Sequence, residues 1–375
     1  MKVLHLCSYY IGNKLYSNMF KQISLEGHDQ EVFIPVRKKE QIGINQLSKE
    51  YKNVSYYYRP ILKKYHRLFY LRKVNKQKNE IKKILQSKCS IDLVHAHTVY
   101  SDGGTAYELY KDYGIEYIVN VRNTDLNWFY KYLFHLRPYM YKILTNAKFI
   151  VFISHSYKDK LLSMLPFNVV NKIKNKCIVI PNGIDNYWHR SKLLKPKNLD
   201  SKNIKLLFIG NLNKNKNIKK VLEVLNILKI NYDMTLDIIG NGPQLKSVKD
   251  YIKKLGLTSN VFYHGYLNER EKILEIMDNC DIFVMPSHRE TFGLVYIEAM
   301  SRGLPVVYTK GQGIDGFFEE GEIGYPVDPA ETNAIVTAIE NIIMNYSNIS
   351  KNCIVNSKAF NWSSVSNEYI KLYNK

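Results

Sequence analysis

The segment "SHRETFGLVYIEAMSRGLPVV" (residues 287–307) joins two apolar runs through a short polar turn. The run before the turn, "DIFVMPS" (281–287), is typical of a buried strand, and "GLVYIEAMSRG" (293–303) is typical of a helix. Glu290 stands in the turn and Glu298 stands inside the helix. The segment therefore predicts a strand that leads directly into a helix, with one carboxylate on each side of the helix start.

A helix start of this kind favours anions, because its first backbone N–H groups have no partner within the helix. Gly293 lets the backbone approach a phosphate closely. A carboxylate such as Glu298 suits a pair of neighbouring hydroxyls, as on a ribose, and Glu290 suits hydroxyls of a group carried by the phosphates. The plainer alternative is a helix-start Glu and a solvent-facing Glu. The strand, glycine and helix around the pair favour the binding interpretation.

Working outward, short apolar runs alternate with amphipathic stretches along the whole chain, which predicts parallel sheets covered by helices. This alternation of apolar and amphipathic segments is interrupted by the polar stretch 185–203 and resumes after it. We therefore expect an α/β protein with two Rossmann-like doubly wound domains that face a central cleft. The expected N-terminal domain is 1–184, joined by helix 358–375, and the expected C-terminal domain is 204–357, after the linker 185–203.

Other turns of the second domain also carry residues suited to a nucleotide. "FIGNLNKNKN" presents Gly210, Asn211, Lys214 and Lys216 after a strand, and a cation there is a reasonable diphosphate ligand. Two further strand ends carry Gly240 with Gly242 and Gly265 with Tyr266. Each turn alone is ordinary. Because strands of a parallel sheet end at one edge, the turns together predict a nucleotide site.

Charge is distributed unevenly between the two halves. The net charge is +20, and residues 1–200 hold 34 Lys and Arg against 15 Asp and Glu, whereas residues 201–375 hold 20 against 19. The excess is densest in residues 59–88, with 11 basic residues and one acid. This stretch interleaves cations with Tyr65, Leu68, Phe69, Tyr70 and Leu71, a pattern that suits an anionic membrane surface. The alternative is a solvated, lysine-rich helix.

Several classes of protein are disfavoured. Five scattered cysteines, Cys7, Cys89, Cys177, Cys280 and Cys353, indicate buried thiols rather than disulfides or a zinc site. The start of the chain lacks a secretory pattern, and no apolar run approaches the roughly 20 residues of a membrane span. No motif of a nucleic-acid binder accompanies the basic half. We expect a cytoplasmic protein held peripherally on the inner face of the cell membrane.

The motifs resemble those of the retaining GT-B glycosyltransferases of family 4. The resemblance rests on "GNLNKNKN", "GNGPQL", "HGYL" and the E-x7-E block, and more loosely on "DLVHAH", "YIVNVRNTD", "IPNGID" and the tail "FNWSSVSNEYIKLY". It covers nearly the whole chain, and the E-x7-E block is its most specific part. It implies a nucleotide-diphosphate sugar as donor and transfer with retained anomeric configuration.

The resemblance also implies roles for single residues. Glu298 would hold the ribose and Glu290 a hydroxyl of the donor sugar, while Lys216 would neutralise the leaving diphosphate. The backbone of Phe292, Gly293 and Leu294 would contact the sugar and diphosphate, with Gly12 near the same phosphates. No Asp-x-Asp triplet is present, which fits transfer without a metal or other cofactor.

This sequence departs from the family pattern at two positions. Asn211 stands where the family usually has Arg, and Arg122 stands where many members have His near the reacting sugar. Arg122 is therefore expected to supply positive charge to the reaction. On the acceptor side of the cleft we expect His97, Asn123 and Asp125.

Two motifs are expected to be decoys. His95 and His97 are expected on opposite faces of a strand, which makes a poor metal pair. "GQGIDG" (311–316) matches a dinucleotide-binding pattern, but no long helix follows it.

The predicted function is sugar transfer to a glycan or lipid-linked acceptor in the synthesis of cell-surface polysaccharide. The alternatives on the same fold are a sugar phosphorylase, which would need a pocket for inorganic phosphate, and a nucleotide-sugar epimerase, which would act without an acceptor. A nucleic-acid binder is the remaining alternative, and the neutral second half disfavours it.

Overall fold

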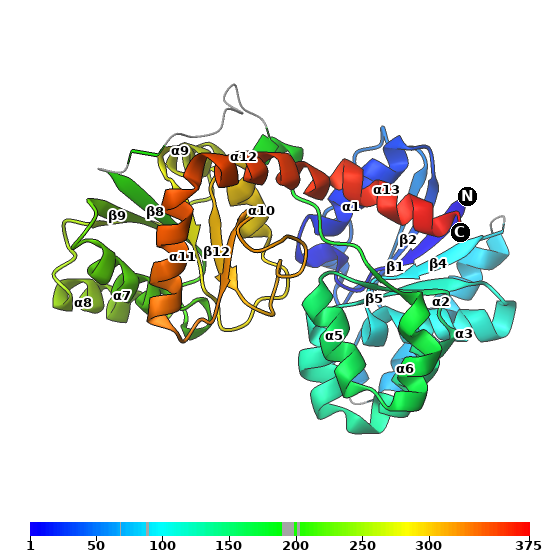
Figure 1. Ribbon diagram of the computed structural model, residues 1–375. Coiled ribbons are helices and arrows are strands. Elements are labelled where there is room, and N and C mark those ends of the chain that lie inside the picture. Colours follow the sequence, from blue (N-terminus) through cyan, green and yellow to red (C-terminus); the bar gives the residue numbers. More distant parts are fainter. Residues whose placement is uncertain (68, 88–89, 190–198, 201–202) are drawn as a thin grey trace. The chain divides into compact units, whose positions relative to one another are not determined.

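The computed structural model describes residues 1–67, 69–87, 90–189, 199–200 and 203–375. The chain divides into two compact units, coloured along the sequence in Figure 1. Unit 1 comprises Met1–Ile153, Tyr157–Gly183 and Trp362–Lys375, and unit 2 comprises Ser154–Ser156 and Ile184–Asn361. Within the described ranges, no helix is both long and apolar enough to cross a membrane.

Unit 1 is built on a parallel sheet with the strand order β3-β2-β1-β4-β5-β6-β7. Its strands are β1 (Lys2–Leu6), β2 (Asp29–Pro35), β3 (Val54–Arg59), β4 (Leu93–Ala96), β5 (Tyr117–Val121), β6 (Phe149–Phe152) and β7 (Cys177–Val179). The central strands are short runs of almost entirely buried residues, as expected for a sheet covered on both faces.

Helices cover both faces of this sheet. They are α1 (Leu15–Leu25), α2 (Tyr70–Ser87), α3 (Gly104–Tyr113), α4 (Arg137–Asn146), α5 (His155–Met164), α6 (Phe167–Ile173) and α13 (Trp362–Tyr373). Helix α3 ends at Tyr113, because Gly114 adopts the left-handed conformation that stops a helix.

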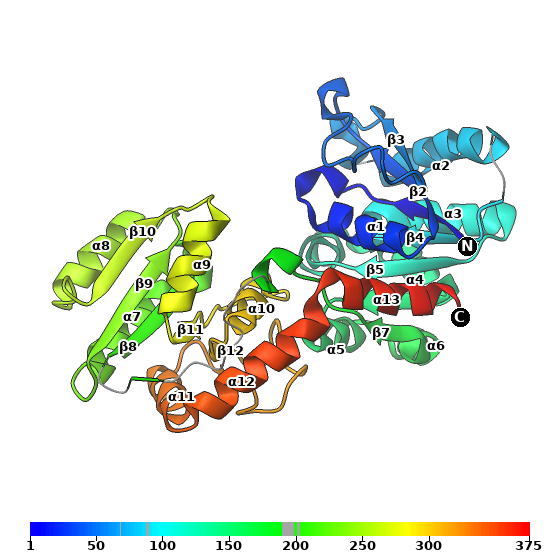
Figure 2. The same ribbon diagram turned by 90° about the horizontal axis from the view of Figure 1, so that it is seen from above.

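The last helix, α13, is part of unit 1, although the whole of unit 2 precedes it in the chain. It lies beside α1 in both views (Figures 1 and 2). Val365 and Tyr369 join a buried cluster with Val3 and Phe20. A side chain at Gly183 would collide with the indole of Trp362, so the helix start packs directly on the backbone after β7.

Unit 2 has a second parallel sheet with the order β10-β9-β8-β11-β12-β13. Its strands are β8 (Ile204–Ile209), β9 (Met234–Ile239), β10 (Val261–Gly265), β11 (Ile282–Val284), β12 (Val306–Thr309) and β13 (Gly324–Val327). Its helices are α7 (Ile218–Leu228), α8 (Leu245–Lys254), α9 (Arg270–Asn279), α10 (Leu294–Ser301), α11 (Thr332–Met344) and α12 (Tyr346–Ser357). Two parallel sheets in two units agree with the predicted fold class.

Three details differ from the sequence interpretation. Two edge strands, β3 and β13, were not expected, because one is a run of tyrosines and the other is four residues long and contains a proline. The expected linker begins with a short 3-10 helix, Asn186–His189, whose Trp188 is buried. Residues 190–198 and 201–202 of that linker lie outside the described residues, as do Leu68, Lys88 and Cys89. Of the other cysteines, Cys7, Cys280 and Cys353 are buried, and Cys177 is partly buried.

Candidate nucleotide-sugar site and acceptor-side residues

The turn between β11 and α10 has the geometry that the E-x7-E segment predicts. Gly293 caps α10 in the left-handed conformation, with φ of 82°. A Cβ at Gly293 would collide with the ring of Tyr296 and lie 3.1 Å from Cγ of Glu290. The hydroxyl of Tyr296 donates to the carbonyl of Met285 at 2.6 Å, which ties the helix to the end of its strand. Glycine is therefore required here both by conformation and by space.

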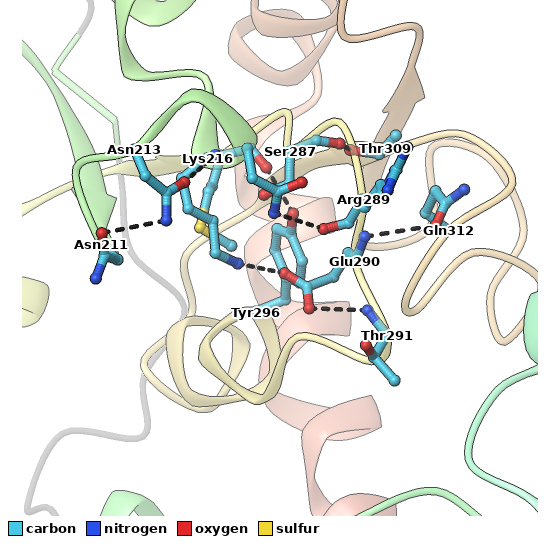
Figure 3. Close-up of polar contacts among 12 residues, drawn as sticks. Asn211, Asn213, Lys216, Ser287, Arg289, Glu290, Thr291, Tyr296, Thr309 and Gln312 are labelled. Atoms are coloured by element: carbon cyan, nitrogen blue, oxygen red, sulfur yellow. Dashed lines mark hydrogen bonds and ion pairs between the residues drawn. The ribbon is translucent and has the colours of Figure 1, made fainter. Parts of the chain in front are cut away.

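The carboxylate of Glu290 is held on two sides, as Figure 3 shows. Nζ of Lys216 lies 2.5 Å from one oxygen, and the backbone N–H of Thr291 donates to the other at 3.0 Å. The two charged side chains expose only 21% and 12% of their surface. The structure thus brings two residues that are 74 positions apart in the sequence into one ion pair.

An asparagine-rich turn after β8 positions Lys216. The side chain of Asn213 accepts from the backbone N–H of Lys216 at 3.0 Å and donates to Oδ1 of Asn211 at 3.1 Å (Figure 3). Asn215 donates its amide to the carbonyl of Arg289 at 2.9 Å. These contacts join the β8–α7 turn to the β11–α10 turn. Asn213 and Asn215 were not predicted as site residues.

The "GQGIDG" loop supports Glu290 from a third strand end. The N–H of Gly313 donates to the carbonyl of Glu290 at 3.2 Å, and Oε1 of Gln312 accepts from its N–H at 3.4 Å. A Cβ at Gly313 would lie 2.8 Å from the carbonyl oxygen of Phe292. The sequence interpretation treats the loop as a decoy, and the element that follows it is the strand β13 rather than a helix. Its glycines nevertheless allow close packing against the candidate site, a role that the sequence interpretation missed.

Glu298 lies on α10 and is partly buried. Burial raises the pKa of its carboxyl to about 7, while Arg270 opposes this shift and Asp185 adds to it. Arg270 and Asp185 form an ion pair at 2.9 Å. Within the described part of the chain, no hydrogen bond reaches the Glu298 carboxylate, so its acceptor capacity is available to a ligand.

The glycines at the other strand ends have different surroundings. A Cβ at Gly242 would lie 2.5 Å from the carbonyl oxygen of Leu212, so Gly242 is explained by the close packing of two turns. Gly210 belongs to the same packing of the two turns, because a Cβ at Gly240 would collide with the carbonyl oxygen of Gly210. Gly265 has φ of 73° and open space around its Cα.

The remaining predicted donor residues differ in exposure. Phe292 is buried, Leu294 is half-buried at the start of α10, and Tyr266 is 70% exposed. Gly12 lies in unit 1, in a short 3-10 helix between β1 and α1, with open space around its Cα.

In unit 1, Arg122 follows β5 and is partly buried. Its Nη1 donates to Oδ1 of Asn182 at 2.9 Å, and its guanidinium lies 5.8 Å from the ring centroid of Tyr16. Asn123 is exposed and accepts a hydrogen bond from Asn127. Arg122 therefore already has structural contacts of its own.

Asp125 is fully buried, which does not fit its prediction as an acceptor contact. Its carboxylate accepts from the backbone N–H groups of Arg122 at 2.9 Å, Val99 at 3.1 Å and Tyr100 at 3.0 Å. Burial raises its pKa to about 6, and these hydrogen bonds oppose the shift. Asp125 fixes the loop that carries Arg122 and has no surface of its own for a ligand.

His97 is likewise fully buried and does not line a surface. The expectation that His95 and His97 lie on opposite faces was wrong, because residues i and i+2 of a strand share a face. Their ring centroids are 4.1 Å apart.

With His5, these two histidines form a group in which one ring nitrogen from each residue lies within 4.8 Å of the other two. Nδ1 of His5 is 3.1 Å from Nε2 of His97, and both nitrogens of His95 contact partners, the Tyr373 hydroxyl at 2.8 Å and Asn120 at 2.9 Å. Burial lowers the pKa of all three rings. This arrangement fits a hydrogen-bonded core cluster better than a metal centre.

The basic stretch 59–88 divides between surface and core. It comprises the end of β3, a 3-10 helix (Lys64–Arg67) and α2. Tyr65, Phe69 and Leu71 expose 47%, 49% and 54% of their surface, but Tyr70 exposes only 5%. Tyr70 was predicted as a surface anchor and is instead a core residue, because it begins α2 on the face that packs against α3.

The geometry of unit 2 suits a diphosphate with sugars at both ends. The start of α10 and Lys216 offer positive charge, Glu290 stands beside them, and Glu298 adds a partly buried carboxylate on the same helix.

Comparison with known proteins identifies the family. Residues 189–360 match the family described as "Glycosyl transferases group 1", and residues 18–186 match "Glycosyltransferase Family 4". An uncharacterized 41.2 kDa protein in the cps region of Klebsiella pneumoniae is 27% identical over 53% of this chain and 55% of its own length. An uncharacterized glycosyltransferase of Methanocaldococcus jannaschii is 25% identical over 84% of this chain and 82% of its own.

The fold has a close counterpart among solved structures. Anabaena HepE, in complex with UDP, superposes with a TM-score of 0.75 over 100% of both chains, at 16% sequence identity. Together, the two family matches along the chain and this fold show that the protein belongs to glycosyltransferase family 4 and has the GT-B fold.

Proposed function

We propose that this protein is a retaining transferase that moves a sugar from a nucleotide-diphosphate sugar to a glycan or lipid-linked acceptor in the synthesis of cell-surface polysaccharide. The observation that carries the proposal is the Lys216–Glu290 pair at the start of α10, with Glu298 on the same helix. The HepE complex with UDP supports a nucleotide donor, and the relative in the cps region supports the pathway.

In this proposal the diphosphate binds at the start of α10, against the backbone of Phe292 to Leu294. Glu298 accepts hydrogen bonds from the ribose, and Glu290 accepts one from the donor sugar. Lys216 leaves its contact with Glu290 in part to contact the diphosphate, whose charge grows as the bond to the sugar breaks.

The transfer itself needs positioning and charge stabilisation rather than a nucleophilic side chain. The acceptor hydroxyl attacks the anomeric carbon on the face from which the diphosphate departs, and the departing phosphate oxygen takes the hydroxyl proton. Arg122 is proposed to add positive charge to the reaction, in place of the usual His. The absence of an Asp-x-Asp triplet and the presence of Lys216 support transfer without a metal.

The first test is a calorimetric screen of UDP, GDP and ADP and of their sugars. Glu298→Ala is expected to weaken binding of the preferred diphosphate by about tenfold or more, since a charged hydrogen bond contributes about 1.5–3 kcal/mol. Glu290→Ala, the matched variant on the other side of the turn, should lower turnover with less effect on the free diphosphate. Unchanged affinity in Glu298→Ala would contradict the site.

Turnover then separates the reaction classes. Transfer requires an acceptor, and its initial product keeps the anomeric configuration of the donor when followed by NMR. Product formation that depends on inorganic phosphate would indicate a phosphorylase, and conversion of donor without acceptor would indicate an epimerase.

We further propose that unit 1 binds anionic membranes peripherally, at the inner face, through the exposed part of residues 59–88. The exposed Tyr65, Phe69 and Leu71 lie among cations, and the guanidinium of Arg72 lies 4.9 Å from the ring centroid of Phe69. Each cation near an anionic leaflet contributes about 1 kcal/mol.

Sedimentation with phosphatidylglycerol vesicles tests the membrane proposal, with phosphatidylcholine vesicles as control. Binding should fall with added salt and in the variant Lys64→Ser, Phe69→Ser, Arg72→Ser. A parent protein that binds neither vesicle type would contradict membrane docking and favour a soluble acceptor.

A further inference from the structure

Unit 1 contains a cavity of about 360 Å³ that none of the predicted site residues lines. Its walls come from the segments after β1 and β2, from the 3-10 helix Lys64–Arg67, and from the beginning of α2. These segments lie at the carboxyl end of the sheet, where α/β folds bind ligands. The cavity is large enough for a ligand of sugar size.

The cavity is strongly basic. Arg37, Lys63 and Lys73 line it, together with His66, and no carboxylate is among its lining residues. In the described part of the chain, none of these three cations has a salt-bridge partner within 4.0 Å. Lys78, on the same helix as Lys73, shows the contrast, since its Nζ lies 3.0 Å from a carboxylate oxygen of Asp112. The cations of the cavity are therefore gathered without a salt bridge among the described residues, and the buried Asp102 and Asp125 attract Lys73 only from outside the lining.

Among the three cations of the cavity, Lys73 is the one whose charged form is disfavoured by burial when no ligand is bound. Burial lowers its pKa to about 8, and the attraction of Asp102 and Asp125 offsets this only in part. An amine that is withdrawn from water without an ion-pair partner destabilises the fold. Binding an anion beside it would remove that penalty.

Two neutral features add to the attraction for an anion. Nδ1 of His66 accepts from the backbone N–H of Lys63 at 3.0 Å, so the neutral ring carries its proton on Nε2, as a donor. Helix α2 begins at Tyr70, in the cavity wall, and the start of a helix carries partial positive charge. The aromatic rings of Tyr9 and Phe129 complete the walls with surfaces suited to the face of a sugar.

We propose that this cavity binds a phosphoryl group on the acceptor, with the adjoining sugar between the aromatic side chains. Three separate cations suit a dianion better than a single carboxylate, and the volume leaves room beyond the phosphate itself. The inference rests on the proposed transferase function, because it names the chemical class of the acceptor. The phosphate could belong to a soluble sugar phosphate or to a phosphate-linked lipid.

The test begins with the nucleoside diphosphate that binds best in the screen, added to saturation so that the donor site is filled. Inorganic phosphate, glucose 1-phosphate and glucose 6-phosphate are then titrated by calorimetry. Saturable binding is expected, and Lys63→Gln and Arg37→Gln should each weaken it about tenfold. Lys38→Gln is the matched control, because Lys38 is an exposed neighbour of Arg37 and does not line the cavity.

The source of the phosphate is tested with phosphatidylcholine vesicles that contain or lack a polyprenyl phosphate. Sedimentation that requires the polyprenyl phosphate and is lost in Lys63→Gln identifies a lipid acceptor. Binding of the soluble sugar phosphates alone identifies a soluble one. Both results support a phosphate pocket.

Two results would overturn the inference while the transferase proposal stands. One is a protein that binds the nucleoside diphosphate but no phosphate compound in solution or in vesicles. The other is an equal loss of binding in Lys38→Gln and Arg37→Gln, which would indicate general surface charge. Failure to bind any nucleoside diphosphate would instead contradict the proposed function, and the phosphate titration of the free protein would still test the cavity.

Discussion

The two basic regions of this protein handle positive charge in opposite ways. In unit 2, Lys216 is paired with Glu290 at 2.5 Å, and two asparagine side chains and a glycine loop hold the pair in place. In unit 1, Arg37, Lys63 and Lys73 line a cavity without a carboxylate. One site is internally neutralised before a ligand arrives, and the other is not.

The difference has a consequence for selectivity. A ligand of the paired site must compete with an internal carboxylate, so a simple anion gains little there. A diphosphate with hydroxyl groups gains more, because the hydroxyls give Glu290 a new partner while the phosphates take Lys216. The unpaired site sets no such condition and is suited to any anion of the right size.

The largest expected effect comes from removing the paired cation. Lys216→Met should lower kcat by about 100-fold or more, because the leaving diphosphate loses a positioned positive charge. Steady-state kinetics with the preferred nucleotide sugar measures it. Lys214→Met, on the same turn but exposed, is the control, and a similar loss there would show that only overall charge matters.

The comparison also predicts that removing a cation without a salt bridge stabilises the protein. Lys73→Met should raise the apparent unfolding temperature at pH 7 by about 2–4 °C, as expected for roughly 1 kcal/mol. The pKa of Lys73 is lowered to about 8 in the folded protein, so the unfolded chain binds more protons between that pH and about 10.5. The parent therefore gains stability as pH rises through this window, and the advantage of Lys73→Met should shrink by pH 9.5. A lower unfolding temperature at pH 7 would contradict an unpaired, penalised amine.

In unit 2, Glu298 corresponds to Lys73, because burial also disfavours its charged form. Its charge is negative, so its effect on stability has the opposite pH dependence. Burial raises its pKa to about 7 in the folded protein, so the folded state binds more protons than the unfolded chain between about pH 4.5 and 7. Stability of the parent falls as pH rises through that window. Glu298→Gln should therefore unfold about 2 °C higher at pH 8 and no higher at pH 4.5, as differential scanning calorimetry can measure. A gain of the same size at both values would assign the effect to packing instead of charge.

The smallest effect is expected from removing metal ions, which should not change the transfer rate. If Lys216 and the start of α10 supply the positive charge for the diphosphate, then excess chelator should leave the transfer rate unchanged. The rate is measured with EDTA, and again after MgCl₂ is added back. A rate that EDTA abolishes and magnesium restores would show that the paired site requires a cation from solution.

The sequence predicts structure correctly where all the residues that determine an element lie in one continuous segment. The apolar runs around residues 287–307 predict β11 and α10, and Gly293 marks the turn between them. The sequence does not predict contacts between segments that are distant along the chain. Gln312 and Gly313 support Glu290 only because β11 and β12 are neighbours in the sheet.

Burial explains the other differences. Asp125 and His97 are polar residues at strand ends, which favoured a surface role, but backbone N–H groups and aromatic rings surround them. Arg37, Lys63 and Lys73 come from separate elements, and nothing in their spacing indicates that they line one cavity. The roles assigned to Glu290, Glu298 and Lys216 remain predictions that the experiments above test.

The position of α13 has a consequence for how the chain is made. Val365 and Tyr369 complete a core whose first residues include Val3 and Phe20, so the ribosome must translate all of unit 2 before that core can close. During this interval one side of α1 and its sheet exposes apolar surface that a chaperone or a neighbouring nascent chain can contact. Unit 1 begins synthesis first but can finish folding only after its partner unit has been translated.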